Sequence, residues 1–153
     1  MIQIDIPNRG TIELQHAVFD INGTLAVDGI PIPGVADCLQ SLAESLSIHL
    51  LTAGTHGNLA ALEQTLGHHL HIIQNGEEKA AFVQQLGPEG VIAFGNGAND
   101  IAMLRLAAVG VAVLVNEGLA TGVLQAADVL TTSPIDAIQL VLHPKRLMAT
   151  LRR

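Results

Sequence analysis

The strongest constraint on the fold is a regular alternation of short apolar segments with segments of helical spacing. Apolar segments of strand length are expected at 16–20, 47–51, 70–73, 91–94 and 109–115, with an edge strand at 129–130. Helical spacing separates them at 34–45, 56–66, 77–86, 100–106, 118–125 and 134–142. Strands that are apolar throughout are buried on both faces. The pattern therefore predicts a mostly parallel sheet between two helical layers, a Rossmann-like three-layer α/β sandwich.

The chain is expected to open with a β-hairpin ahead of this sheet. Residues 2–6 and 11–15 alternate apolar and polar side chains around Pro7-Asn8-Arg9-Gly10, a sequence suited to a turn. No repeat or linker divides the 153 residues, so we expect a single domain over residues 1–153.

Composition narrows the range of partners. Charged residues make up 14% of the chain, against about 25% in typical domains, which favours burial of apolar surface in a homo-oligomer. A formal net charge of −7 speaks against nucleic acid as a partner. No apolar run approaches the roughly 20 residues that span a bilayer, and the lone Cys38 suits a reducing compartment. These features predict no membrane partner and a cytoplasmic location.

One basic cluster runs against the acidic balance. It lies at the end of the chain and comprises Lys145, Arg146, Arg152 and Arg153. Either these cations occupy the last turn of a helix, where they complement its dipole, or they form a tail that binds nucleic acid. The chain has no Trp or Tyr and only three Phe, so the aromatic platforms that stack on bases are missing. This absence favours the helix.

Polar residues gather where the predicted strands end. Asp20, Thr52 and the loop Gly95-Asn96-Gly97 each follow an apolar strand. Ligands of parallel α/β sheets bind at the carboxyl ends of the strands, and the helix N-termini at that edge favour an anion. We therefore expect these groups to meet in one crevice.

Each of these segments alone also has a structural interpretation. Ile21-Asn22-Gly23 could be a tight turn, and the residue types favour turn and active site about equally. Asn99 and Asp100 could simply cap a helix, and Lys79 could be a solvated surface residue. Their order along the chain is more informative, because it supplies a carboxylate, a hydroxyl, an ammonium group and a polar glycine-rich loop.

That order resembles the haloacid dehalogenase (HAD) superfamily, whose motifs are Asp-x-Asp-Gly-Thr, a Thr or Ser after a strand, a Lys, and Gly-Asp-Gly-x-Asn-Asp. The corresponding segments of this chain are, in order, Phe19-Asp20-Ile21-Asn22-Gly23-Thr24, Leu51-Thr52, Lys79 and Phe94-Gly95-Asn96-Gly97-Ala98-Asn99-Asp100. Within the superfamily the chain is most similar to the small soluble P-type ATPase-like group. Segments 77–80, 126–129 and 144–152 carry that closer resemblance.

The resemblance implies a role for each matching residue. Asp20 would attack phosphorus and form an aspartyl phosphate, while position 22 would hold the general acid/base. The phosphate group would be bound by Thr52, Ala53, Gly54, Lys79 and Asn99. The cofactor would be Mg2+, held by Asp20, the backbone carbonyl of Asn22, and the side chain of Asn96 or Asp100, together with water and phosphate. The implied enzyme is a Mg2+-dependent phosphohydrolase or phosphotransferase.

Two departures from the motifs bear on activity. Asn22 stands where phosphatases of the superfamily carry the acid/base Asp, and an amide neither donates nor takes up a proton at neutral pH. We expect a slowly hydrolysing phosphoenzyme that forms best from donors with good leaving groups, such as ATP or acyl phosphates. Asn96 replaces a metal-binding Asp, so we expect weak Mg2+ binding in which Asp100 carries a larger share.

The spacing leaves no room for a cap domain between Asp20 and Thr52 or between Thr52 and Lys79. An open, capless site suits a bulky or macromolecular phosphorylated substrate, or closure by a neighbouring subunit. Two other functions remain open. One is a catalytically impaired phosphate-binding regulator, which the two Asn replacements favour, and the other is an interaction module. The latter leaves the positions of Thr52 and Lys79 unexplained.

A short histidine cluster is a separate candidate. His68, His69 and His71 surround a predicted strand, and His69 and His71 would share one face of it. Two metal ligands are conceivable there. Because no partner acid or Cys is evident nearby in the sequence, we expect ordinary histidines at a strand edge.

Overall fold

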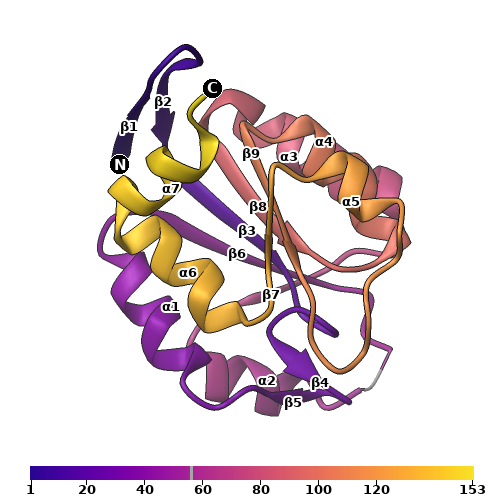
Figure 1. Ribbon diagram of the computed structural model, residues 1–153. Helices are drawn as coiled ribbons and strands as arrows, with labels where there is room; N and C mark the ends of the chain where they lie inside the picture. The colour runs from indigo at the N-terminus through magenta and orange to yellow at the C-terminus, as the bar shows by residue number, and fades with distance from the viewer. Residues whose placement is uncertain (56) are drawn as a thin grey trace.

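The computed structural model describes residues 1–55 and 57–153, and a six-stranded parallel sheet forms its centre (Figure 1). The strand order is β10-β9-β8-β3-β6-β7. The strands are β3 (His16–Asp20), β6 (Ser47–Thr52), β7 (Leu70–Ile72), β8 (Val91–Gly95), β9 (Val109–Val113) and β10 (Val129–Thr131). β3 therefore lies inside the sheet, and β10 lies at an edge as expected.

Helices cover both faces of this sheet. One face carries α1 (Val35–Ala43), α6 (Pro134–Leu142) and α7 (Pro144–Leu151), with α2 (Leu59–Leu66) beside α1. The other carries α3 (Gly76–Leu86), α4 (Ile101–Leu106) and α5 (Val123–Ala126). Alternate residues of β3 point to opposite faces of the sheet and pack in two separate hydrophobic cores. Ala17 and Phe19 belong to one core, and Val18 belongs to the other. The predicted three-layer α/β sandwich is confirmed.

The predicted N-terminal hairpin is also present. β1 (Ile2–Ile6) and β2 (Gly10–Leu14) pair antiparallel and form a sheet of their own. Their inward side chains Ile4, Ile6 and Leu14 are buried, and α7 packs against β1. The hairpin thus lies at the end of the central sheet where β3 begins, away from Asp20 (Figure 1).

A second, smaller hairpin lies at the opposite end. β4 (Ala26–Val27) pairs antiparallel with β5 (Ile30–Pro31), between the end of β3 and the start of α1. We call residues 26–31 the flap. Its backbone is tied to the strand end, because the amides of Gly23 and Ala26 donate to Ala26 O and Ile21 O at 2.7 and 3.0 Å.

Capping residues explain where helices α6 and α3 begin. Ser133 caps α6 through hydrogen bonds from Ile135 N and Asp136 N, and Pro134 occupies the first helical position. α3 is capped by Asn75, whose side chain accepts from Glu78 N. α3 consequently begins at the same end of the sheet as the flap.

Three expectations need correction. The helix expected at 56–66 begins at Leu59, and residue 56 of that prediction lies outside the described residues. The helix expected at 118–125 covers only Val123–Ala126. In the basic cluster, Lys145 and Arg146 lie in the first turn of α7 and so at the positive end of its dipole, with only Arg152 and Arg153 at its far end. No helix among the described residues is long and apolar enough to cross a membrane.

Candidate active site

A buried lysine between two carboxylates forms the centre of the site. Lys79 Nζ donates to Asp20 Oδ1 and to Asp100 Oδ1, each at 2.7 Å. The side chains of Lys79, Asp20 and Asp100 are only 1%, 10% and 0% exposed. They come from three elements, namely the start of α3, the end of β3 and the short 3-10 helix after β8 (Ala98–Asp100). The sheet therefore brings together the residues that the motifs predicted.

Burial sets the protonation of this cluster. Burial and then the negative charge of Asp100 raise the pKa of Asp20 to about 7, although Lys79 and Thr24 act in the opposite direction. Burial alone would lower the pKa of Lys79, but the charges of Asp20 and Asp100 outweigh it and raise that pKa. Lys79 is thus a fixed cation beside the proposed nucleophile.

The Asp100 carboxylate accepts hydrogen bonds from backbone amides as well as from Lys79. Its second oxygen, Oδ2, accepts from Asn96 N and Gly97 N, both at 2.9 Å. This approach requires Gly95, because a Cβ there would lie 2.6 Å from the Asp100 side chain. Both oxygens of Asp100 already accept hydrogen bonds, so the geometry favours it as an anchor for Lys79 and the loop. A larger share of metal binding for Asp100 stays a prediction.

Thr24 is a site residue that the motif comparison left without a role. Its buried hydroxyl lies 3.1 Å from Asp20 Oδ2 and 3.2 Å from Asn96 Oδ1, so it brings these two oxygens together. Asn96 Nδ2 donates to Gly118 O at 3.1 Å, which fixes its amide orientation. Gly23 has φ +81, and a Cβ there would collide with Asn96. The sequence could have identified Thr24 as a site residue, because Thr is the last residue of the Asp-x-Asp-Gly-Thr motif.

The oxygen atoms around Asp20 suit a hard cation. Asn22 Oδ1 is buried and has no hydrogen-bond partner within residues 1–55 and 57–153, and a buried polar atom normally has one. Separately, the Thr24 hydroxyl brings Asp20 Oδ2 and Asn96 Oδ1 together. Carboxylate and amide oxygens are ligands of Mg2+, so this donor set fits the predicted cofactor. The described residues hold no group of three or more His, Cys, Asp or Glu arranged for a metal.

The predicted phosphate-binding residues surround the same strand ends. Thr52 is buried at the end of β6, one residue beyond the Asp20–Leu51 pairing, and its hydroxyl accepts from Gly54 N at 3.1 Å. Ala53 and Gly54 follow it. Asn99 is exposed in the short 3-10 helix at Ala98–Asp100, packed beside Gly76 at the start of α3. All four therefore lie at the edge that carries Asp20, as predicted.

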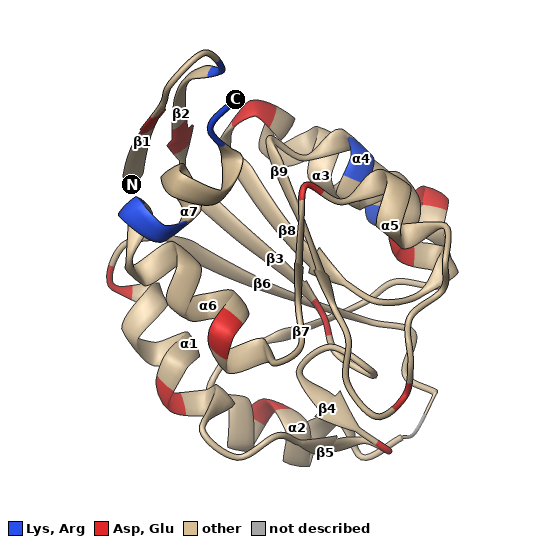
Figure 2. Cartoon of the chain, viewed as in Figure 1, with Lys and Arg blue, Asp and Glu red and all other residues tan. Residues whose placement is uncertain are grey.

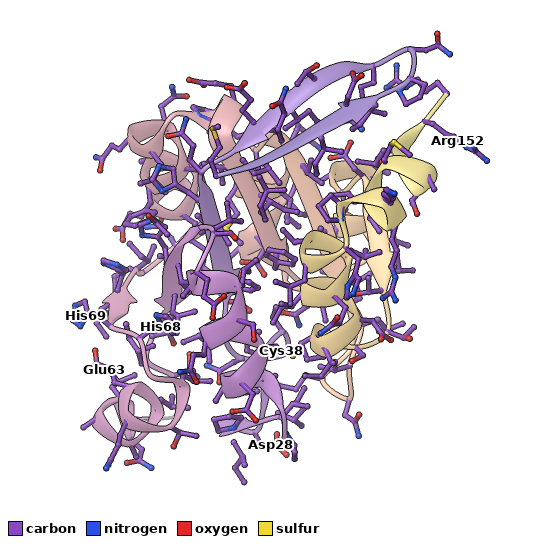
Figure 3. All side chains as sticks on the ribbon, turned by 90° about the vertical axis from the view of Figure 1, so that its left-hand side faces the viewer. Asp28, Cys38, Glu63, His68, His69 and Arg152 are labelled. Atoms are coloured by element: carbon purple, nitrogen blue, oxygen red, sulfur yellow. The ribbon has the colours of Figure 1, made fainter. Side chains whose placement is uncertain are left out.

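The histidine cluster differs from the prediction in one respect. His69 Nδ1 lies 2.7 Å from Glu63 Oε1, so a partner acid is present (Figure 3). A row of histidines crosses adjacent strands, since His16 Nδ1 lies 3.1 Å from His49 Nε2 and the rings of His49 and His71 are 6.1 Å apart. The pairing register of β3, β6 and β7 places these histidines side by side. The sequence alone does not predict this register.

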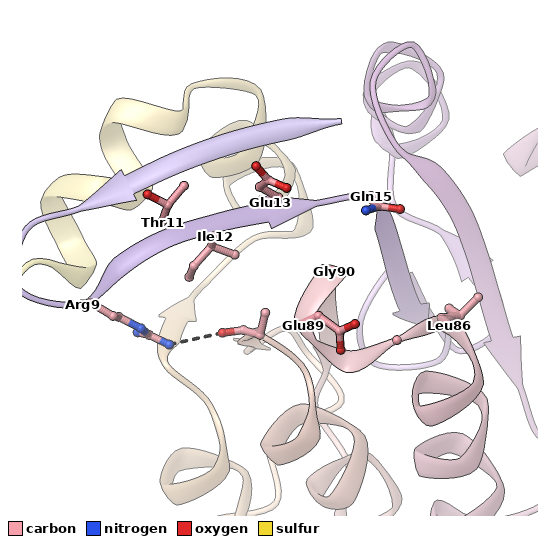
Figure 4. Close-up of a pocket in the computed structure, with 10 residues that line it drawn as sticks. Arg9, Thr11, Ile12, Glu13, Gln15, Leu86, Glu89 and Gly90 are labelled. Carbon is pink, nitrogen blue, oxygen red and sulfur yellow. Dashed lines mark hydrogen bonds between the residues drawn. The ribbon is translucent and has the colours of Figure 1, made fainter.

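A groove of about 630 Å³ lies between the N-terminal hairpin and the turn at residues 86–90, and Figure 4 shows the residues that line it. Arg9 lines it and donates to Ala108 O at 3.2 Å. This groove lies at the end of the sheet opposite Asp20, so it takes no part in the site.

The chain also matches a known protein family. A family model described as haloacid dehalogenase-like hydrolase matches residues 36–137. In addition, an uncharacterized protein of Methanocaldococcus jannaschii is 37% identical over 62 residues, which are 40% of this chain and 67% of that protein.

Solved structures support the fold independently. The 3-deoxy-D-manno-octulosonate 8-phosphate phosphatase of Moraxella catarrhalis, in complex with a magnesium ion, a phosphate ion and a KDO molecule, matches with a TM-score of 0.67 at 17% identity. The match covers 91% of this chain and 94% of that one. The catalytic domain of the CPx-ATPase CopB-B matches with a TM-score of 0.60 at 27% identity, over 73% of this chain and 46% of that one. The catalytic domain of this ATPase thus shares the fold over the matched part.

Proposed function

Because this chain belongs to the haloacid dehalogenase-like hydrolases, we propose that it is a slow, Mg2+-dependent phosphohydrolase or phosphotransferase that acts through an aspartyl phosphate at Asp20. The observation that carries this proposal is the buried contact of Lys79 with Asp20 at 2.7 Å. Burying three charged side chains is costly, and their position at the carboxyl ends of the strands is where ligands of such sheets bind.

In the proposed first step, an Asp20 carboxylate oxygen attacks phosphorus, and the bond from phosphorus to the leaving group breaks with its electron pair on the leaving group. Lys79 and Thr52 would stabilise charge on the phosphoryl oxygens. Mg2+, held by Asp20, Asn22 and the side chain of Asn96 or Asp100, would supply further positive charge at these oxygens. Asp100 would keep Lys79 in place.

In the second step, water attacks phosphorus and releases phosphate from Asp20. Asn22 offers an amide where related phosphatases have a carboxyl, so it would not take the proton of the attacking water. A missing general acid/base typically costs about 10²- to 10⁴-fold in rate. The phosphoenzyme should therefore persist, a property that fits the similarity to ATPase domains.

Intact-mass spectrometry tests the proposal directly. The protein is incubated with Mg2+ and acetyl phosphate or ATP, beside an Asp20→Asn variant. We expect a phosphate adduct on the parent chain and none on the variant, because the amide introduced there cannot replace the nucleophilic carboxylate. Equal labelling of both proteins, or no adduct from any donor, would contradict the proposed nucleophile.

A second candidate is a phosphate-binding regulator with an impaired site. It is favoured by one specific observation, the amides at Asn22 and Asn96 where the family motifs have carboxylates. Asn96→Asp separates the two functions, since Asn96 Oδ1 already faces Asp20 through Thr24. A catalytic site should bind Mg2+ more tightly after this change, as measured by calorimetry. Unchanged Mg2+ binding, together with no adduct, would favour the regulator.

A further inference from the structure

Asn96 is held by a segment to which the motifs assign no role. This segment, residues 114–122, follows β9. Gly118 O accepts a hydrogen bond from Asn96 Nδ2 at 3.1 Å, and Ala120 N donates to Asn96 O at 2.9 Å. Because Gly118 engages the nitrogen of the amide, Asn96 turns its Oδ1 toward the Thr24 hydroxyl, which lies 3.2 Å away. The orientation of this amide therefore depends on the position of Gly118.

Orientation matters at position 96 because the residue is Asn and not Asp. A carboxylate offers an oxygen whichever way the side chain is turned, whereas an amide has one oxygen and an NH2 group that only donates hydrogen bonds. Mg2+ is bound by oxygen atoms. Both oxygens of Asp100 already accept hydrogen bonds, so Asn96 Oδ1 is the side-chain oxygen of this loop that is open to a metal. A reversed amide would remove this ligand from the proposed site.

The flap is hydrogen-bonded to the same segment. Its tight turn is formed by Asp28 and Gly29, which both have positive φ. The amide of Asp28 donates to Glu117 Oε2 at 3.1 Å. Among residues 1–55 and 57–153, no other hydrogen bond joins the flap to segment 114–122. Figure 2 shows the flap strands β4 and β5 at the end of the molecule opposite the N-terminal hairpin.

Glu117 and Gly118 belong to one tight turn. Gly118 N donates to Val115 O at 2.9 Å, and Gly118 has φ +84, a conformation that favours glycine. The carboxylate that accepts from the flap and the carbonyl that accepts from Asn96 thus come from adjacent residues of this turn. A displacement of Glu117 would therefore displace the carbonyl of Gly118.

Side chains do not fill the space between the flap and this segment. A groove of about 430 Å³ lies there, and its walls include Val27, Ile32, Leu114, Val115 and Asn116. Packing across the groove therefore does little to fix the flap against the segment. The hydrogen bond from Asp28 to Glu117 has the larger share in holding them together.

We propose that Glu117 is a positioning residue that couples the flap to the orientation of Asn96, an inference that rests on the proposed Mg2+ site beside Asp20. When Glu117 holds the flap, Gly118 keeps Asn96 Oδ1 available to Mg2+. When the flap is released, the amide turns either way and Mg2+ binds less tightly. Mg2+ binding and the flap contact therefore favour each other by the same factor.

Removing the acceptor at position 117 should weaken Mg2+ binding. An Asn96 amide that turns freely presents its oxygen about half of the time, which raises the Kd about twofold. Loss of one hydrogen bond changes an equilibrium by about fivefold. We therefore expect Glu117→Ala to raise the Kd for Mg2+ about two- to fivefold, as measured by calorimetry without a phosphoryl donor. The Mg2+ concentration for half-maximal labelling of Asp20 by acetyl phosphate should rise by the same factor, and the maximal rate should change less.

Two matched variants separate the contact from the charge. Glu117→Gln removes the same negative charge but keeps an oxygen that accepts from Asp28 N, so it should bind Mg2+ like the parent chain. Glu44→Ala removes an exposed carboxylate after α1 and should also leave the Kd unchanged.

A double variant tests the role of the amide. Asn96→Asp offers an oxygen in either orientation, so adding Glu117→Ala to it should weaken Mg2+ binding much less than in the parent chain. An adduct on Asp20 with an unaltered Kd in Glu117→Ala, equal weakening in Glu117→Gln, or undiminished weakening beside Asn96→Asp would overturn this inference alone. No adduct from any donor, with no Mg2+ bound by the parent chain, would overturn the proposed function and this inference together.

Discussion

The molecule holds an ion-pair cluster at each end of its sheet, and the two differ in burial. At the carboxyl ends of the strands, Lys79 is 1% exposed between Asp20 and Asp100. At the opposite end, Arg9 of the N-terminal hairpin pairs with Asp128 at 3.0 Å, with side chains 21% and 28% exposed. The two clusters also differ in what their charges connect.

The Arg9–Asp128 pair joins parts of the structure. Asp128 accepts from Gly110 N at 2.8 Å, and Arg9 donates to Ala108 O, so the pair fastens the hairpin to the segments that flank β9 and β10. Such a partly exposed pair adds little free energy and costs little. The buried cluster is costly to form, because three charged groups leave water, and hydrophobic residues would fill that space as well. The proposed phosphorylation of Asp20 would account for this costly arrangement.

Removing the central cation should give the largest effect. Lys79→Met leaves Asp20 and Asp100 buried without their common partner, so we expect the free energy of unfolding to fall by about 3–5 kcal/mol and phosphorylation of Asp20 to be lost. Urea denaturation measures the first and intact mass the second. Lys145→Met, at an exposed position on α7, is the matched control and should change neither.

The same variant offers a sharper form of this test. Adding Asp20→Asn to Lys79→Met removes one of the two unpaired charges, so part of the lost stability should return. A loss below about 1 kcal/mol in Lys79→Met, or no recovery in the double variant, would show that the buried cluster behaves like the exposed pair.

Restoring a carboxylate to the motif should have the next largest effect. Asn22→Asp supplies a general base for the attacking water, and we expect hydrolysis of the phosphoenzyme to accelerate by about 10²- to 10⁴-fold. Decay of the phosphate adduct after removal of the donor gives the rate. Asp28→Asn, also in the segment after β3, serves as a control that should leave it nearly unchanged. An unaltered decay rate would mean that position 22 does not limit turnover.

Lys79 and Gly118 illustrate how much of the structure could be predicted from the sequence. The strands, the helix at 134–142 and the edge position of β10 follow from local patterns and capping residues, and they agree with the structure. The burial of Lys79 depends on a partner 59 residues away, which helical spacing does not reveal. Similarly, the helix expected from residue 118 begins at Val123, because Gly118 O and Ala120 N are bonded to Asn96.

At the other end of the sheet, a smaller effect is expected. Arg9→Met removes the ion pair, but Asp128 keeps its bond from Gly110 N, so we expect the free energy of unfolding to fall by only about 1 kcal/mol. Phosphorylation of Asp20 should be unchanged. Arg105→Met on α4 is a control for general loss of charge. A loss near that of Lys79→Met would contradict the distinction between the two clusters.

A comparably small effect is expected from the histidine row, which has neither the carboxylate partners of Lys79 nor the ion pair made by Arg9. Burial, and then the neighbouring His16 and His71, lower the pKa of His49 to about 4. The ring of Phe82 from α3 packs against it with centroids 5.4 Å apart. A His with a depressed pKa stabilises the fold above its unfolded value of about 6.5, and that stability is lost as the pH falls toward 4.

Because His49 is only half-buried, we expect it to account for about 1 kcal/mol of the stability lost between pH 7 and pH 5. Urea titrations at both pH values measure this loss, and His49→Gln should reduce it while His143→Gln, at an exposed site, should not. An equal loss in His49→Gln would place the acid sensitivity elsewhere. If the prediction holds, histidines packed against one another favour the neutral state, whereas the charges of Lys79 and its partners are kept by their opposite signs.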